Sequence, residues 1–152
     1  MPESIAKKFR ILMIEDSQER IDKIRSWLPV NYVLVAATSA GKAIGILQRD
    51  KGYVYGALML DHDLNEQVAT ATDLTLSGTD IVKSLIANLS LDVSILVHSM
   101  NPSRSPAMAK KLTQAKFDVI RIPFEELKKD VFLEWINEAY LDWVYINDVT
   151  GV

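Results

Sequence analysis

The sequence predicts a single α/β domain, with a five-stranded parallel sheet between two layers of helices. Short continuous apolar runs, typical of strands buried on both faces, alternate along the chain with segments whose apolar residues recur at helical spacing. The chain has 152 residues, 49% of them hydrophobic, which suits one domain with a substantial core. Alternating strands and helices form a parallel sheet through right-handed crossovers, which gives a three-layer sandwich spanning residues 1–152.

The N-terminal half contains two predicted helices between its strands. Asp16 or Ser17 can cap the first helix, which Pro29 ends, and Ser39 can cap the second, which Gly45 weakens. The strands of this half are predicted at 9–14, 32–37 and 56–60.

The C-terminal half begins with a long polar connection, residues 61–78, before a third helix. Ser105 followed by Pro106 predicts the start of a fourth helix. The periodicity of the last helix is the strongest in the chain and ends at Trp143, so the segment 141–152 is left open as a frayed tail or a surface for another chain. The strands of this half are predicted at 93–97 and 117–122.

Ionisable residues follow three of the predicted strands. About five strand–helix units in this length suggest the flavodoxin-like strand order 2-1-3-4-5, in which strands 1, 3 and 4 are neighbours. The carboxyl ends of these strands would then meet at one rim, and both histidines of the chain lie there. The residues concerned are Glu15, Asp16, Asp61, His62, Asp63, His98 and Ser99.

Two chemistries fit this rim. Glu15, Asp16 and Asp61 offer the oxygen ligands that Mg²⁺ takes, and a histidine ligand would shift the preference towards Mn²⁺ or Zn²⁺. Alternatively, His62 and His98 could flank a phosphate as base and acid. Simpler interpretations stay open beside these: the acids after the first strand can cap a helix, and either histidine alone can be a surface residue.

An anion could also meet residues after the fourth strand. Ser99 and Asn101 could donate hydrogen bonds to phosphate oxygens, and Arg104 lies near a predicted helix N-terminus.

Composition excludes several classes of function. The formal net charge is −3, which argues against non-specific duplex DNA binding. The absence of cysteine excludes disulfides, thiolate nucleophiles and cysteine-based zinc sites. Neither a signal peptide nor an apolar run of membrane-spanning length is visible, so we expect a cytoplasmic protein without a membrane partner.

The arrangement resembles the receiver domain of two-component response regulators over about residues 9–143. The resemblance implies that Glu15 and Asp16 hold Mg²⁺ and that Asp61 is the phosphoacceptor. Two departures stand out: Ile122 lies where receivers have a lysine, and receivers do not usually carry histidines such as His62 and His98.

With these departures, the sequence resembles the cyclic-phosphate-processing receiver family, an offshoot of the receiver domain. The resemblance lies in the segments 60–64, 78–80 and 97–102. It implies that the domain binds or opens a cyclic phosphate on a nucleotide or an RNA end.

Three hypotheses follow for the function. In the first, His62 and His98 move protons during attack on a cyclic phosphodiester, while Asp16, Asp61 and Asp63 orient the imidazoles or hold Mg²⁺ or Mn²⁺. In the second, the chain is a stand-alone response regulator phosphorylated on Asp61. In the third, it is a degenerate receiver that only binds a protein partner or a second copy of itself.

Overall fold

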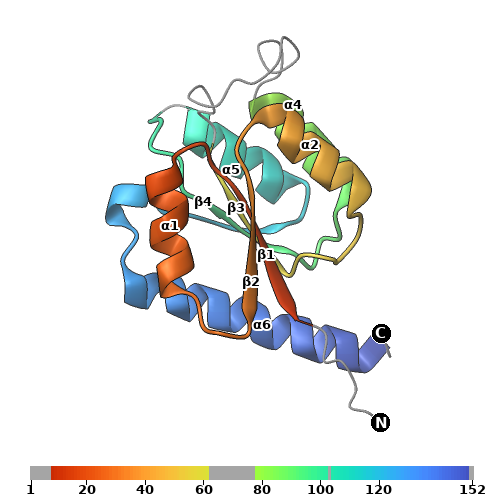
Figure 1. Ribbon diagram of the computed structural model, residues 1–152. Coiled ribbons are helices and arrows are strands. Elements are labelled where there is room, and N and C mark those ends of the chain that lie inside the picture. The colour runs from red at the N-terminus through yellow and green to blue at the C-terminus, as the bar shows by residue number, and fades with distance from the viewer. Residues whose placement is uncertain (1–7, 62–77, 103, 151–152) are drawn as a thin grey trace.

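The computed structural model describes residues 8–61, 78–102 and 104–150. Within these residues, five parallel strands form one sheet in the order β2-β1-β3-β4-β5, so the predicted flavodoxin-like order is confirmed (Figure 1). The strands are β1 (Phe9–Ile14), β2 (Tyr32–Ala37), β3 (Ala57–Leu60), β4 (Ser94–Val97) and β5 (Asp118–Arg121).

Helices cover both faces of the sheet, as the predicted three-layer sandwich requires (Figure 1). One face carries α2 (Ala40–Arg49), α4 (Gly78–Asn88) and α5 (Arg104–Gln114). The other face carries α1 (Gln18–Trp27), the short 3₁₀ helix η1 (Phe124–Glu126) and α6 (Lys129–Thr150).

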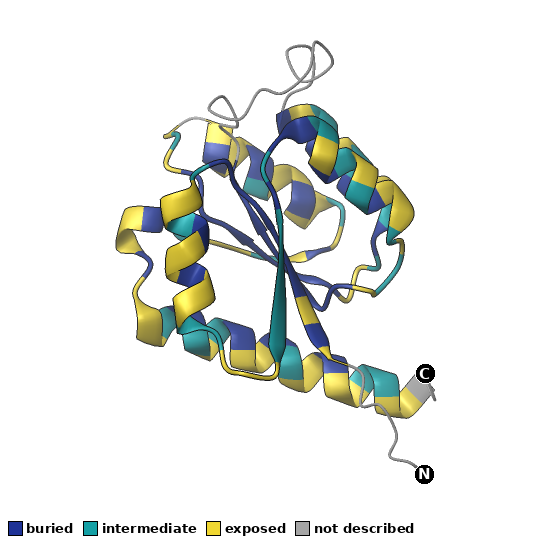
Figure 2. Ribbon diagram, in the orientation of Figure 1, coloured by how far each residue is buried: buried dark blue, intermediate teal, exposed yellow. Residues whose placement is uncertain are grey.

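The alternation of side chains along each strand divides the core between the two faces. In β1, Leu12 and Ile14 pack beneath α2, α4 and α5, whereas Ile11 and Met13 pack beneath α1 and α6. In Figure 2, β3 and β4 are buried along their whole length, and β1 is buried except at Arg10. This explains why they are continuous apolar runs in the sequence rather than alternating ones.

Side-chain caps fix where the helices begin. Ser17 Oγ accepts a hydrogen bond from the Arg20 amide at 3.4 Å, and Ser39 caps α2 in the same way. The predicted Ser105 cap is wrong, because α5 begins at Arg104 and its amide donates to Asn101 Oδ1 at 2.8 Å. Ser105 is instead buried in the first helical turn.

The C-terminal helix extends into the segment 141–152, for which the sequence allowed either a frayed tail or a surface for another chain. α6 continues through 22 residues to Thr150, so residues 141–150 are helical rather than frayed. Leu141, Tyr145 and Val149 are exposed on this part of the helix. None of the helices in the described ranges is long and apolar enough to cross a membrane.

Gly56 lies where the chain has no room for a side chain. A Cβ atom there would overlap the ring of Phe9, which is buried and makes edge contacts with Tyr140 and Trp143. We therefore expect Gly56→Ala to lower the free energy of unfolding by about 2 kcal/mol, as overpacked cores do. Urea unfolding of both proteins measures the difference.

Gly45 provides the matched control for this substitution. It lies inside α2, and a Cβ atom there would meet nothing within 4 Å. Since alanine has the higher helix propensity, Gly45→Ala is expected to raise stability by up to about 1 kcal/mol. Equal effects of the two substitutions would contradict the steric argument.

Candidate functional site

Strand register brings three ionisable residues together at the carboxyl edge of the sheet. Ile14 is paired with Leu60, and Leu60 with Val97. The next residues, Glu15, Asp61 and His98, are therefore neighbours across β1, β3 and β4. The Asp61 and His98 amides continue the backbone ladder, donating to the carbonyls of Ile14 and Leu60 at 3.0 Å each.

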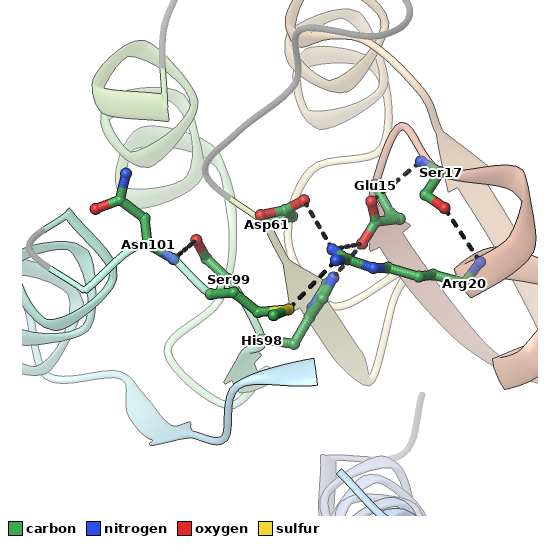
Figure 3. A network of polar contacts seen from close by, with 8 residues as sticks. Glu15, Ser17, Arg20, Asp61, His98, Ser99 and Asn101 are labelled. Atoms are coloured by element: carbon green, nitrogen blue, oxygen red, sulfur yellow. Dashed lines mark hydrogen bonds and ion pairs between the residues drawn. The ribbon is translucent and has the colours of Figure 1, made fainter. Parts of the chain in front are cut away.

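The same alternation turns these three side chains to one face. Glu15, Asp61 and His98 follow the phase of Met13, Met59 and Leu96, which pack towards α1 and α6. Figure 3 shows the three side chains converging in front of the strand ends. All three are buried, with exposed fractions of 0%, 3% and 0%.

The centre of the cluster is a hydrogen bond between His98 Nε2 and Glu15 Oε1, 2.9 Å long. Burial alone would raise the pKa of Glu15, but the hydrogen bond from His98, the hydrogen bond from the Ser17 amide and the Arg20 guanidinium outweigh it. Together they lower the pKa of Glu15 from 4.5 to about 2. Glu15 is thus an anion at neutral pH.

An ionised carboxylate can only accept hydrogen bonds, so Nε2 of His98 carries the proton in this contact. Nδ1 of the same ring is buried and has no hydrogen-bond partner among the described residues. The Phe124 ring packs against the imidazole, with 5.8 Å between ring centroids. Glu15 and Phe124 therefore fix the orientation of the imidazole ring.

Arg20 of α1 supplies a cation to the cluster. Its Nη1 lies 3.6 Å from Glu15 Oε1 and 3.8 Å from Asp61 Oδ2. Nη2 donates to Met100 Sδ at 3.3 Å, and the guanidinium carbon lies 5.2 Å from the centre of the Phe124 ring. Figure 3 shows the side chain reaching from α1 across the strand ends.

Arg20 is not among the site residues that the sequence predicts. Ile122 occupies the lysine position of receivers, which suggested that no cation stands beside Asp61; the structure corrects this, because the cation comes from α1. The signal lay in Ser17: a helix capped by this residue starts at the rim, so its first-turn side chains lie beside the strand ends.

The cluster also contains a set of atoms that suits a divalent cation. One ligand atom each from Glu15, Asp61 and His98 lies within 4.8 Å of the others. Two carboxylates and an imidazole fit Mn²⁺ or Zn²⁺ better than Mg²⁺, which prefers oxygen ligands. Since Arg20 already lies beside both carboxylates, a metal ion would compete with the guanidinium for this position.

The remaining predicted residues occupy different places. Asp16 is buried at the same rim, but the atoms that come together as metal ligands belong to Glu15, Asp61 and His98. Metal binding by Glu15, Asp16 and Asp61 stays a prediction. His62 and Asp63 lie outside the described residues.

Ser99 and Asn101 organise the turn that follows β4. Ser99 Oγ accepts a hydrogen bond from the Asn101 amide at 3.2 Å, and Asn101 in turn caps α5 at Arg104. Figure 3 places both on the side of the cluster away from Arg20. Arg104 is exposed and lines a groove between α4 and α5 rather than the buried cluster.

Comparison with known families bears on this site. The family model described as the cyclic-phosphate processing receiver domain matches residues 10–114, which include Glu15, Asp61 and His98. The chain belongs to this family. The resemblance recognised in the sequence is therefore confirmed, although it does not show that this receiver binds or processes a cyclic phosphate.

Solved receiver structures support the fold of this receiver. A signal receiver domain from Vibrio parahaemolyticus is similar with a TM-score of 0.69 at 18% identity, covering 95% of this chain and 99% of that one. A CheY-like response regulator receiver from Methanospirillum hungatei JF-1 has a TM-score of 0.64 at 15% identity, covering 91% and 98%. No curated protein sequence matches the chain.

Proposed function

We propose that this receiver binds a cyclic phosphate on a nucleotide or an RNA end and opens the ring with water. The observation that supports this most is the buried pair of His98 and Glu15, in which Glu15 holds one ring nitrogen and leaves the other without a partner among the described residues. A carboxylate that orients a histidine in this way is the usual arrangement of a general base.

The proposed reaction adds one water molecule to the cyclic phosphodiester. A water oxygen attacks the phosphorus as its proton passes to Nδ1 of His98, and the bond from phosphorus to one ribose oxygen breaks. That ribose oxygen must gain a proton, and the sequence offers His62, outside the described residues, as the donor. The product is a phosphate monoester with a free neighbouring hydroxyl.

Arg20 would stabilise the charge on the phosphate during this step. Its distances to the two carboxylates exceed those of direct hydrogen bonds, so neither carboxylate holds the guanidinium by a hydrogen bond. Its side chain is 30% exposed, whereas that of Glu15 is fully buried. Movement of Arg20 would open the cluster and let the guanidinium pair with the incoming phosphate.

Two further groups would contribute to the same site. Ser99 Oγ accepts its hydrogen bond from Asn101, so its own hydroxyl hydrogen is the group that would donate to a phosphate oxygen. A divalent cation held by the carboxylates of Glu15 and Asp61 would supply Lewis-acid stabilisation of the phosphate charge.

The test is a titration of the protein with a nucleoside 2′,3′-cyclic phosphate, followed by NMR. We expect the imidazole signals of His98 and His62 to shift together and the phosphorus signal to change from cyclic diester to monoester. Shifts without ring opening would reduce the function to binding. If neither the imidazole signals nor the phosphorus signal changes, with or without Mn²⁺, the proposal is wrong.

Phosphorylation of Asp61 is the second candidate function. Asp61 is buried at the end of β3, and the Arg20 cation lies 3.8 Å from its Oδ2. This function predicts that a small phosphodonor with Mg²⁺ adds one phosphoryl group to the protein, as seen by intact mass. Asp61→Asn should abolish the gain, whereas Asp50→Asn, at the end of α2, should not.

A further inference from the structure

A groove lies between α4 and α5, the helices that follow β3 and β4 along the chain. Its volume is about 420 Å³, within the range of roughly 300–1,000 Å³ that is usual for small-molecule sites. Val82 of α4 and Ala107 and Met108 of α5 provide apolar walls. The groove can therefore hold a planar apolar group such as a nucleobase.

Two cations line the α5 side of this groove. Arg104, Ala107, Met108 and Lys111 are spaced i, i+3, i+4 and i+7, so they share one helix face. Arg104 and Lys111 lie about 10 Å apart along the helix axis. Neither side chain forms a hydrogen bond or ion pair with another described residue, and both are exposed in a chain of net negative charge.

The groove begins at the rim that carries the buried cluster. α4 starts at Gly78 and α5 at Arg104, and both helix starts face the carboxyl edge of the sheet, as in parallel α/β domains (Figure 1). Hydrogen bonds from the Asn101 amide to Ser99 Oγ and from the Arg104 amide to Asn101 Oδ1 connect the residues between His98 and the groove. A ligand held at His98 could therefore extend into the groove past this turn.

Building on the proposed function, we infer that the groove binds the nucleotide next to the cyclic phosphate. Arg104 and Lys111 pair with its phosphate, and its base packs between Val82 and Met108. The substrate class is then an oligonucleotide end that carries a cyclic phosphate, rather than a mononucleotide.

The inference is tested with three ligands: a nucleoside 2′,3′-cyclic phosphate, a dinucleotide that ends in one, and a dinucleotide that ends in a linear 3′-phosphate. We expect the cyclic dinucleotide to bind about tenfold more tightly than the cyclic mononucleotide, as one or two charge-assisted contacts allow. The linear dinucleotide should shift the amide signals of Thr79 and Ala107, which line the groove.

Lys110 gives a matched control on the same helix. Both Lys110 and Lys111 are exposed, but only Lys111 lines the groove. Lys111→Gln should lower the affinity for the cyclic dinucleotide about tenfold, whereas Lys110→Gln should leave this affinity unchanged. Equal losses in the two variants, or equal affinities of the wild type for the cyclic mononucleotide and the cyclic dinucleotide, would overturn the inference.

The three ligands also separate this inference from the proposed function. If the mononucleotide ring opens but the second nucleotide adds no affinity, the groove inference is wrong and the proposed function stands. If both dinucleotides bind with the same dependence on Lys111 and no ring opens, the groove inference stands and ring opening is wrong. If none of the three ligands binds, both are overturned.

Discussion

Replacing His98 by glutamine is expected to lower the rate of cyclic phosphate opening by at least about 100-fold, the usual contribution of a general base. The glutamine amide nitrogen reaches the position of Nε2, so it can keep the hydrogen bond to Glu15 that now measures 2.9 Å. It places nothing at the position of Nδ1. The substitution therefore removes the atom that would accept the proton while keeping the hydrogen bond to Glu15.

His98→Asn gives the complementary substitution, because its shorter amide reaches the position of Nδ1 but leaves Glu15 without its partner. An amide does not accept a proton at neutral pH, so this variant should also be inactive, and less stable than the glutamine variant. Initial rates from phosphorus NMR and urea unfolding give both comparisons. If His98→Gln retains most of its activity, His98 is not the base.

Most of the fold could be predicted from the sequence because its strands are short apolar runs, of which β3 and β4 are buried on both faces. The continuous apolar runs mark β1 and β2 with the bounds that the structure has, Phe9–Ile14 and Tyr32–Ala37. Helix starts were harder to predict, because the segment before α5 offers two competing capping residues. Ser105 and Asn101 are both good local caps, and the packing that buries Ser105 selects Asn101.

The meeting of Glu15, Asp61 and His98 follows from two simple facts about parallel strands. The predicted order 2-1-3-4-5 makes their strands neighbours, and all three stand one residue beyond the strand ends. The role of Arg20 could not be found from strand patterns, because it depends on where α1 packs.

Replacing Glu15 by glutamine is the second large expected effect, and it acts on stability. The side chain is fully buried and touches His98, Arg20 and the Ser17 amide. Loss of its charge removes the partner of Arg20 and weakens a charge-assisted hydrogen bond, at a cost of about 2 kcal/mol at pH 7. Urea unfolding of the two proteins at pH 7 measures this difference.

The difference between wild type and Glu15→Gln should depend on pH in a defined direction. Because folding lowers the pKa of Glu15 from 4.5 to about 2, the carboxylate stabilises the folded state fully above pH 4.5. This contribution is lost as the pH falls through about 2, below which the carboxyl is protonated in both states. The two proteins should therefore converge in stability as the pH falls from about 5 to below 2.

Asp50 tests whether burial is what protects the Glu15 interaction. Its pKa is also lowered to about 2, with the hydrogen bond from Arg49 as the largest cause, and a hydrogen bond from Tyr55 adds to it. Arg49, however, is 68% exposed. Salt at about 1 M should therefore reduce the effect of Asp50→Asn much more than that of Glu15→Gln. If salt reduced both effects equally, the interactions of Glu15 would be as open to solvent as those of Asp50. The cluster would then not be the closed site in which Nδ1 of His98 is proposed to act.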